Sequence, residues 1–314
     1  MIGAKITGIE YFLPRNTENN KTLKKDNPKL NVEGVFKKTG INKRHVSSSN
    51  EDTIDLAEKS IKKLLKKFPN TKIDFLILVT QTSPYRIPTA ACILQDKLKL
   101  DKELIAFDIN LGCSGFIYAL NIANALIKSQ EAKNGIIVCA DTYTKMISKK
   151  NIQCRPIFSD AAAATMICKS NINKIGPFLL GTDGSGFNAL KLEQGKNEVE
   201  MNGAQVLTFA MSIVPENVKK LLKKSSISSK KIDYFIFHQA SKYILENINR
   251  KLLIPKDKTY ENYNKVGNTI SASIPIALKD ASKNKIKNNN NLIIAGYGVG
   301  LSWGSAIIKW SNLK

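Results

Sequence analysis

The sequence predicts an α/β protein made of two similarly built halves, and three observations carry this prediction. Strand-like apolar runs alternate with helical patterns along the 314 residues. The apolar runs are continuous, which is typical of strands that are covered by helices on both faces. In addition, KIDFLI (72–77) in the first half is echoed by KIDYFI (231–236) in the second, each time after a Lys-rich helical pattern.

Each expected element follows from its apolar pattern. Strands are expected at the continuous apolar runs 72–81, 104–110, 135–141, 231–239 and 291–298. Helices are expected where apolar residues recur every three or four positions, in 52–67, 89–98, 114–129, 209–224, 241–252 and 273–284. The polar stretch SNINKIGP interrupts the alternation near residue 170. We therefore expect the two halves to span residues 1–170 and 171–314.

Charge and hydropathy limit the classes of function. A net charge of +22 is compatible with nucleic-acid binding. The lysines, however, recur at spaced helix-surface positions, as in SIKKLLKKFPN, so we expect solvated helices and no nucleic-acid partner. No apolar run reaches the ~20 residues that span a bilayer, and the start of the chain lacks a signal-peptide pattern. A cytoplasmic protein without a membrane span is the expectation.

The cysteine and histidine content argues against a metal site or a disulfide framework. The chain has five cysteines, an odd number without a C-x-x-C pair, and only two histidines. A zinc cluster or a set of disulfides would require more ligands or an ordered pairing. We therefore expect no metal, and we expect most of these thiols to be small buried apolar groups.

Cys113 is the cysteine with a distinctive setting. In FDINLGCSGFIYAL (107–120) an apolar strand passes into an apolar helix at Gly112-Cys113-Ser114-Gly115. A thiol at a helix N-terminus faces unpaired N–H groups and the positive end of the helix dipole, which favours the thiolate. The flanking glycines permit a tight turn and close approach of a substrate. A buried structural cysteine is the alternative.

Three further positions in the second half are candidates for chemistry. His238 ends the apolar run YFIFHQ, at the edge of the sheet where α/β proteins place catalytic groups, although a structural histidine is the alternative. The other histidine, His45, lies in the polar stretch NKRHVSSS and is expected at the surface. Asn268 follows a glycine at a turn, where it could cap the next helix. The run GYGVG (296–300) lacks the Lys-Ser/Thr of a P-loop and fits a backbone-lined oxyanion pocket better.

Together these residues resemble the β-ketoacyl-acyl-carrier-protein synthase III family of the thiolase superfamily. The motifs that carry the resemblance stand in the order KKTGINKRHV, IPTAACILQ, GCSGF, IFSDAAAA, TDGSG, HQAS, GNT and GYGVGLSWGSAII. The resemblance implies a thiolase-like five-layer α-β-α-β-α sandwich of two duplicated halves, usually a homodimer. It also implies no cofactor, an acyl-coenzyme A or acyl-carrier thioester as substrate, and an acyl carrier protein as partner.

The resemblance further implies a division of catalytic work. Cys113 would take an acyl group, and His238 with Asn268 would hold the thioester carbonyl of a malonyl-carrier substrate while it loses carbon dioxide. The backbone N–H groups of Cys113 and Val299 would form the oxyanion hole. An amide at position 268 favours condensation, because a carboxylate there would repel the enolate. The alternatives are acyl transfer to an oxygen or nitrogen acceptor, and a basic binding protein without catalysis.

The finer sites follow from the same resemblance, together with departures from it. The acyl pocket would be lined by Ile87, Phe158, Leu190 and Leu207, and the acyl carrier protein would dock on Lys242, Arg250 and Lys251, with Tyr243 in place of a further basic residue. Ile87 replaces an aromatic residue that commonly reaches across the dimer, so a longer or branched acyl group is expected. The usual coenzyme A contacts are replaced by Gly34, Lys38, Ile152 and Ala204. We therefore expect an acyl carrier protein as acyl donor, and a specialised pathway as one possible setting.

Overall fold

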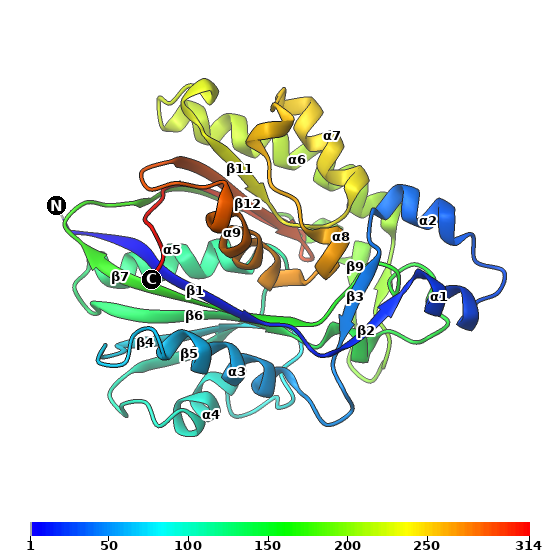
Figure 1. Cartoon of the computed structure of the whole chain (residues 1–314), viewed down its shortest axis with the longest axis horizontal. Coiled ribbons are helices and arrows are strands. Elements are labelled where there is room, and N and C mark those ends of the chain that lie inside the picture. Colours follow the sequence, from blue (N-terminus) through cyan, green and yellow to red (C-terminus); the bar gives the residue numbers. More distant parts are fainter. Residues whose placement is uncertain (1) are drawn as a thin grey trace.

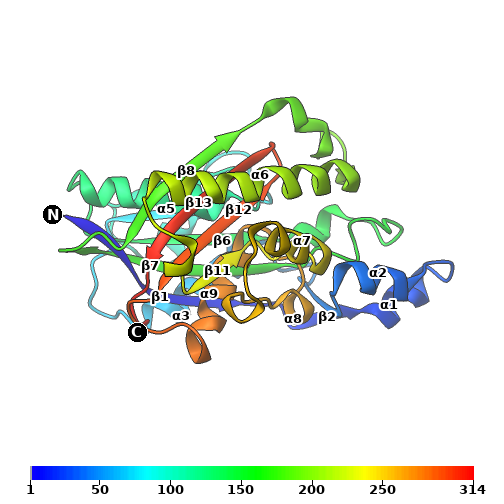
Figure 2. The ribbon, with the colours of Figure 1, turned by 90° about the horizontal axis from the view of Figure 1, so that it is seen from above.

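The chain folds into five alternating layers of helices and sheets. The computed structural model describes residues 2–314 (Figures 1 and 2). The layers are, in order, an outer helical layer, a five-stranded sheet, a central helical layer, a four-stranded sheet and a second outer helical layer. This α-β-α-β-α order is the one that the family resemblance implied.

The first sheet belongs to the N-terminal half. Its strands in spatial order are β1 (Gly3–Phe12), β7 (Ala161–Ser170), β6 (Asn134–Asp141), β4 (Phe75–Val79) and β5 (Ile105–Ile109). Strands β5, β4 and β6 are parallel, whereas β7 and β1 are antiparallel to their neighbours. The outer face is covered by α3 (Thr53–Leu65) and α4 (Ala90–Lys97).

The second sheet repeats this plan with fewer strands. Its strands in spatial order are β11 (Tyr234–Phe237), β12 (Asn291–Gly298), β13 (Ser302–Lys309) and β8 (Ile175–Thr182). Its outer face is covered by α6 (Gly203–Lys224) and α7 (Lys242–Leu252), and α5 (Gly115–Lys128) and α9 (Ser273–Asn284) lie between the two sheets. The remaining short elements are β2 (Asn16–Asn19), β3 (Lys43–Val46), β9 (Leu190–Lys191), β10 (Glu200–Met201), α1 (Asn20–Asp26), α2 (Val32–Thr39), α8 (Tyr263–Val266) and five 3-10 turns at 143–146, 184–189, 229–231, 256–258 and 270–272.

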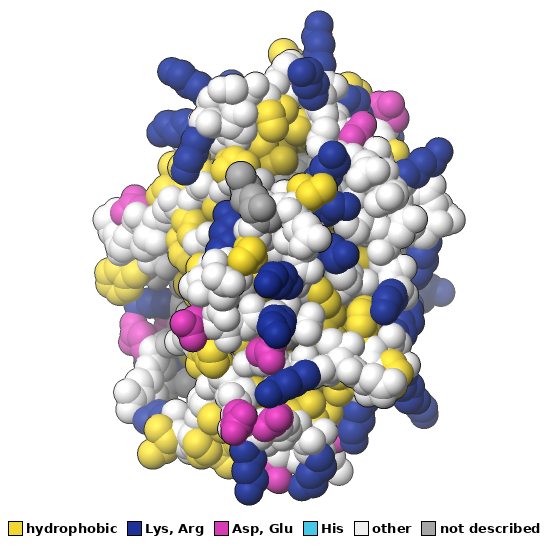
Figure 3. All heavy atoms as spheres, turned by 90° about the vertical axis from the view of Figure 1, so that its left-hand side faces the viewer, with side chains coloured by type: hydrophobic (Ala, Val, Ile, Leu, Met, Phe, Trp, Pro, Cys, Tyr) yellow, Lys and Arg dark blue, Asp and Glu magenta, His cyan; other side chains and the backbone are white. Residues whose placement is uncertain are grey.

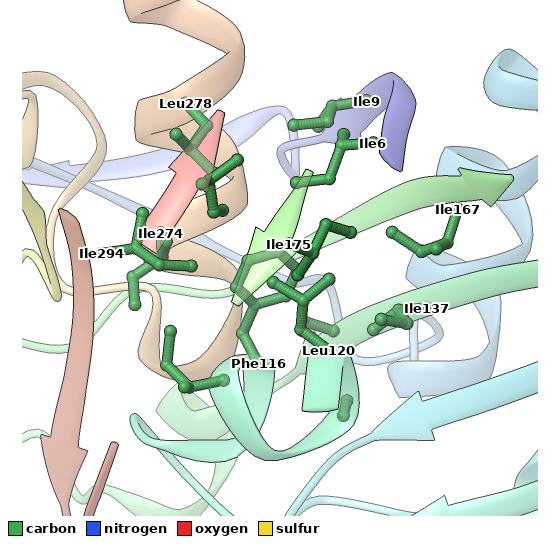
Figure 4. Packing of buried hydrophobic residues seen from close by; sticks show 14 of the residues in the cluster. Ile6, Ile9, Phe116, Leu120, Ile137, Ile167, Ile175, Ile274, Leu278 and Ile294 are labelled. Atoms are coloured by element: carbon green, nitrogen blue, oxygen red, sulfur yellow. The ribbon is translucent and has the colours of Figure 1, made fainter. Parts of the chain in front are cut away.

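The largest apolar core fills the space between the sheets. Phe116 and Leu120 of α5 and Leu278 of α9 extend into it, where they meet isoleucines of both sheets (Figure 4). Residues 161–164 of β7 are four consecutive buried alanines. Their small side chains let helices approach this strand closely on both faces. The same alanines explain why no strand was predicted there, because alanine is depleted in strands.

The sequence echo corresponds to a repeated structural contact. Asp74 donates its backbone N–H to the Asn134 carbonyl (2.8 Å), and its carboxylate accepts the Asn134 N–H (3.0 Å). Asp233 makes the same exchange with Asn291, at 2.9 and 2.7 Å. Each aspartate therefore ties the start of one parallel strand to its neighbour. The proposed division between residues 170 and 171 lies in the turn between β7 and β8 and remains a proposal.

Several elements differ from the sequence prediction. Strands β1, β7, β8 and β13 were not expected, and α6 begins at Gly203, upstream of residue 209. Basic side chains are dispersed over the face in Figure 3, between uncharged side chains. Among residues 2–314, no helix combines the length and apolar character needed to cross a membrane.

Candidate active site

Residues from both halves line one cavity of about 70 Å³. Cys113 from the first half and His238 and Asn268 from the second all contribute to it, and each is buried. The rest of the lining is mostly apolar and consists of Ile157, Phe158, Leu190, Met201, Val206, Ala240, Ser241, Ile244, Tyr297 and Gly298. The fold thus brings into one pocket three residues that lie far apart in the sequence.

The end of β12 passes directly beside Cys113, and its glycines make this possible. A Cβ atom at Gly298 would lie 3.2 Å from the Cys113 Sγ, and one at Gly296 would lie 2.5 Å from the Cys113 carbonyl oxygen. The backbone contact at Gly296 leaves no room for a side chain, and a side chain at Gly298 would displace the Cys113 side chain. Cys113 itself precedes Ser114, the N-cap of α5, so its sulfur is held at the N-terminus of that helix.

His238 follows β11 and is held by the first residue of α9. Its Nδ1 lies 2.7 Å from the Ser273 Oγ, and both residues are buried. Burial lowers the pKa of His238 to about 3, although the backbone of Ile270 opposes the change. The imidazole is therefore neutral at physiological pH, because the folded protein disfavours its protonated form.

Asn268 is oriented by backbone contacts with the first half. Its N–H donates to the Ile157 carbonyl (3.0 Å), and its carbonyl accepts the Ser159 N–H (2.9 Å). The side-chain Oδ1 accepts the Ile270 N–H (3.0 Å), which leaves the amide NH₂ as a donor for the cavity. Gly267 has a φ of +73°, and a Cβ there would lie 2.7 Å from the Ser159 Cβ, so this turn requires glycine.

The resting charge of Cys113 differs from the sequence prediction. Burial raises the pKa of the Cys113 thiol well above its ordinary range, and the Asp141 carboxylate adds to the rise. The Cys113 backbone N–H acts in the opposite direction but is the smaller influence. The expectation of an easily ionised resting thiol is therefore wrong, since desolvation outweighs the helix N-terminus.

Asp141 is a buried carboxylate that sequence reasoning missed. It ends β6, and burial raises its pKa to about 7 against the hydrogen bonds that it accepts. The donors are the Gln81 N–H (2.8 Å) and the hydroxyls of Ser271, Thr82 and Thr80. Its position at the C-terminal end of a parallel strand was a usable signal.

The pH dependence of Cys113 alkylation tests this charge assignment. An ordinary cysteine has a pKa of about 8.5. Because the folded protein favours the thiol of Cys113, its alkylation rate should still be rising above that pH. Asp141→Asn removes a negative charge and should shift the midpoint to lower pH. Peptide mass spectrometry after timed iodoacetamide treatment measures the rate at Cys113 alone. A rate that reaches its plateau below pH 7 would contradict the assignment.

Known proteins resemble this chain over nearly its whole length. The family model for 3-oxoacyl-[acyl-carrier-protein (ACP)] synthase III matches residues 107–184, and the model for the C-terminal part of that family matches residues 222–310. A beta-ketoacyl-[acyl-carrier-protein] synthase III of Clostridium perfringens is 35% identical over 98% of this chain and 100% of its own. The chain belongs to the synthase III family.

Solved structures of synthase III proteins share its fold. One 3-oxoacyl-(acyl-carrier-protein) synthase III is 31% identical with a TM-score of 0.94, covering 98% of this chain and 100% of that chain. The synthase III of Aquifex aeolicus is 32% identical with a TM-score of 0.92 and the same coverage. The predictions of the family and of a thiolase-like α/β fold are confirmed.

The acyl-pocket residues expected for a synthase III are only partly at the cavity. Phe158 and Leu190 line it, whereas Leu207 does not. Val206 takes that place, because consecutive helical residues point about 100° apart. Ile87 is 86% exposed in the loop before α4 and lies outside this chain's cavity.

Other predicted positions are also placed by the synthase III fold. Val299 packs in the same apolar cluster as Cys113. His45 is buried, with Nδ1 2.8 Å from the Pro14 carbonyl, so its expected surface position is wrong. Its polar neighbours gave no indication that β3 packs beside residues 159 and 160, where the His45 N–H donates to the Ser159 Oγ (2.7 Å) and the His45 carbonyl accepts the Asp160 N–H (2.8 Å).

Sequence reasoning also missed Tyr143 and Ser273. The Tyr143 ring is buried with its centroid 5.0 Å from that of Phe158, in the apolar cluster that contains Cys113. The sequence around each residue does not indicate its role, because that role depends on a partner distant in the sequence, Phe158 for Tyr143 and His238 for Ser273.

The three docking candidates all lie on α7. Lys242 begins this helix, directly after the cavity residue Ser241, whereas Arg250 and Lys251 lie in its last turn. At 1.5 Å per residue, Lys242 and Lys251, the two ends of this basic series, are roughly 14 Å apart along the helix. Arg250 is exposed and bonds to the Asn247 side chain (2.5 Å), and the exposed Lys251 bonds to a carbonyl of α6 (3.0 Å).

Proposed function

We propose that this chain is a condensing acyltransferase of the β-ketoacyl-acyl-carrier-protein synthase III type, acting in fatty-acid or related acyl-chain biosynthesis in the cytoplasm. The observation that carries this proposal is the shared cavity of Cys113, His238 and Asn268. A nucleophilic sulfur beside two neutral hydrogen-bond donors suits thioester chemistry in which negative charge develops on oxygen.

In the first step, the Cys113 sulfur attacks the acyl thioester. A carbon–sulfur bond to Cys113 forms, the bond to the donor sulfur breaks, and the proton of the thiol ends on the leaving thiolate. The exchange is chemically symmetrical, and no net proton is taken up or released. Because burial raises the pKa of Cys113, the thiol is the form that meets the acyl donor, and its proton passes to the leaving sulfur as the exchange proceeds. The backbone N–H groups of Cys113 and Val299 are proposed to receive the oxyanion.

In the second step, a malonyl-carrier thioester loses carbon dioxide. The electron pair of the broken carbon–carbon bond moves into an enolate, whose oxygen is held by the His238 Nε2–H and the Asn268 amide. The enolate carbon attacks the acyl-Cys113 carbonyl, and collapse of the adduct expels the Cys113 thiolate, which takes up one proton. The products are carbon dioxide and a β-ketoacyl-carrier extended by two carbons.

The alternative within this fold is acyl transfer to an oxygen or nitrogen acceptor. The synthase III relatives of this chain do not favour this alternative. Asn268 also argues against it, because its free NH₂ suits an enolate oxygen. Measurement of carbon dioxide from carboxyl-labelled malonyl-carrier separates the two reactions. We expect one carbon dioxide per acyl group consumed, whereas the alternative predicts none.

We propose an acyl carrier protein as the acyl donor. Gly34 lies in α2, and Ile152 is 52% exposed in a turn. Neither side chain offers the stacking or the positive charge that would hold an adenine nucleotide. Intact-mass analysis with matched acyl-carrier and acyl-coenzyme A donors should show faster modification of Cys113 by the carrier. Equal rates at equal low concentrations would refute the donor assignment.

Carrier docking is proposed to use the basic residues of α7. Changing Arg250 and Lys251 to Glu should reduce carrier-dependent turnover at least about tenfold at low salt, because complementary charge accelerates encounter. Reaction with a small N-acetylcysteamine thioester should be little changed. The matched control is Lys62→Glu with Lys63→Glu on α3, in the opposite outer layer. Equal losses with both donors, or an equal loss in the control, would contradict this docking site.

We also propose that the protein is a homodimer. Strand β5 is an edge strand of the first sheet, with Ile105 37% exposed, and the apolar side chains of Ile87 and Tyr85 are exposed on the same half. An open strand edge with apolar side chains is suited to pairing with another chain. Sedimentation analysis measures the oligomeric state.

A further inference from the structure

Ser273 contacts His238 on the ring nitrogen that the proposed chemistry leaves unused. Ser273 is the first residue of α9 and is almost wholly buried. Its hydroxyl lies 2.7 Å from His238 Nδ1. The other ring nitrogen, Nε2, is on the opposite side of the imidazole and is the proposed donor to the enolate. A neutral imidazole carries one ring proton, so a bond to one nitrogen determines what the other can do.

The partners of the Ser273 hydroxyl indicate where its proton points. The Gln239 backbone N–H lies 3.5 Å from the Ser273 Oγ, and an N–H can only donate. The oxygen of Ser273 is therefore an acceptor towards Gln239. Among its contacts in residues 2–314, His238 Nδ1 is the one partner able to accept the hydroxyl proton. An Nδ1 that accepts a proton carries none, which places the ring proton on Nε2.

We propose that Ser273 is a positioning residue that fixes His238 in the Nε2–H tautomer and aims this N–H into the cavity. The inference deepens the proposed function and rests on it for its kinetic consequence. The distance, the burial of both groups and the donor at Gln239 carry it. Ser273 would act through His238 without touching the substrate.

This tautomer separates the two chemical steps. A His238 that carries its proton on Nε2 can donate to the enolate oxygen but cannot accept the thiol proton at the same nitrogen. Acylation of Cys113 should therefore depend little on Ser273, whereas loss of carbon dioxide should depend on it strongly. A purely structural serine would affect both steps alike.

The second histidine provides an internal reference. His45 Nδ1 lies 2.8 Å from the Pro14 carbonyl, which can only accept, so His45 must carry its proton on Nδ1. The two histidines of the chain are thus expected in opposite tautomers. Selective ¹⁵N-histidine labelling gives two imidazole rings to assign, and the tautomer of the His45 ring is set by its carbonyl partner.

Long-range ¹H–¹⁵N correlation spectra of the labelled full-length protein test the proposal directly. The couplings from the two ring C–H protons identify each nitrogen, and the ¹⁵N shift shows whether it is protonated. We expect Nε2–H for His238 and Nδ1–H for His45 near pH 7.5, with His238→Ala used to assign the signals. Observation of His238 as Nδ1–H, or as an even mixture, would overturn the proposal.

Kinetics of Ser273 variants provide the second test. Ser273→Ala should lower carbon dioxide release from malonyl-carrier by about 10- to 100-fold, the range seen when a metal-bound histidine loses its orienting partner. Cys113 acylation should stay within about threefold of wild type, because the oxyanion of that step is assigned to backbone N–H groups and not to the His238 Nε2–H. Ser273→Thr, which keeps the hydroxyl, should recover much of the release and the Nε2–H signal.

The outcomes distinguish this inference from the proposed function. If Ser273→Ala leaves both the tautomer and carbon dioxide release unchanged, the role of Ser273 is refuted. If the alanine variant does not fold, the wild-type tautomer and Ser273→Thr still decide the question. If wild-type protein releases no carbon dioxide, the proposed function fails, while the tautomer is judged by the spectra alone.

Discussion

Cys113→Ala should lower condensation on the order of 10⁴-fold or more, because no other thiol among residues 2–314 lines the cavity to carry the acyl intermediate. Cys113 is the cysteine that lines the cavity with His238 and Asn268. The enolate donors remain in this variant, so malonyl-carrier should still lose carbon dioxide without forming a longer product. Product analysis and carbon dioxide release, measured on the same samples, check both expectations.

The matched control for this variant is Cys92→Ala. Cys92 is an exposed thiol in α4, outside the cavity. Its removal should leave condensation unchanged. Substantial product formation by Cys113→Ala would show that the acyl group does not pass through this sulfur.

Asn268→Asp should lower the rate of carbon dioxide release at least about 10²- to 10³-fold, the usual effect of losing an oxyanion donor. The variant also introduces a carboxylate where the enolate oxygen must sit, which adds repulsion to the loss of the donor. Acylation of Cys113 should continue, since that oxyanion is assigned to backbone N–H groups. Intact mass follows acylation, and labelled carbon dioxide follows the second step.

Asn217→Asp serves as the control for burying a new carboxyl group. Asn217 is a buried amide of α6 that bonds to Ser305, away from the cavity. This control should reduce stability and leave the ratio of the two steps unchanged. Equal impairment of both steps in Asn268→Asp would contradict its assigned role.

The sequence predicted the parts of the fold that depend on local patterns. The continuous runs at residues 72–81 and 291–298 became β4 and β12, because buried parallel strands are apolar on both faces. Strand β7 was missed because its alanines are selected for small size in the core and not for strand propensity. Packing of this kind is a property of the assembled layers, which a local pattern does not contain.

The sequence indicated which residues could form the candidate site, but it did not indicate the protonation state of its thiol. The positions of Cys113, His238 and Asn268 after strands or at turns could be read from the sequence. The raised pKa of Cys113 could not, because burial of the thiol and its proximity to Asp141 arise only in the folded protein. Ser273 was missed because its partner, His238, lies 35 positions earlier in the chain and meets it only in the folded protein.

The central claim is that Cys113 carries an acyl group that is then joined to a decarboxylated malonyl unit. The most direct measurement is intact mass of the protein after loading with an acyl-carrier donor, followed by addition of carboxyl-labelled malonyl-carrier. We predict that the mass of Cys113-acyl protein appears on loading and then disappears as one labelled carbon dioxide and one β-ketoacyl-carrier form per site. Loss of the acyl mass without carbon dioxide, or product formation without an acylated Cys113, would contradict the account.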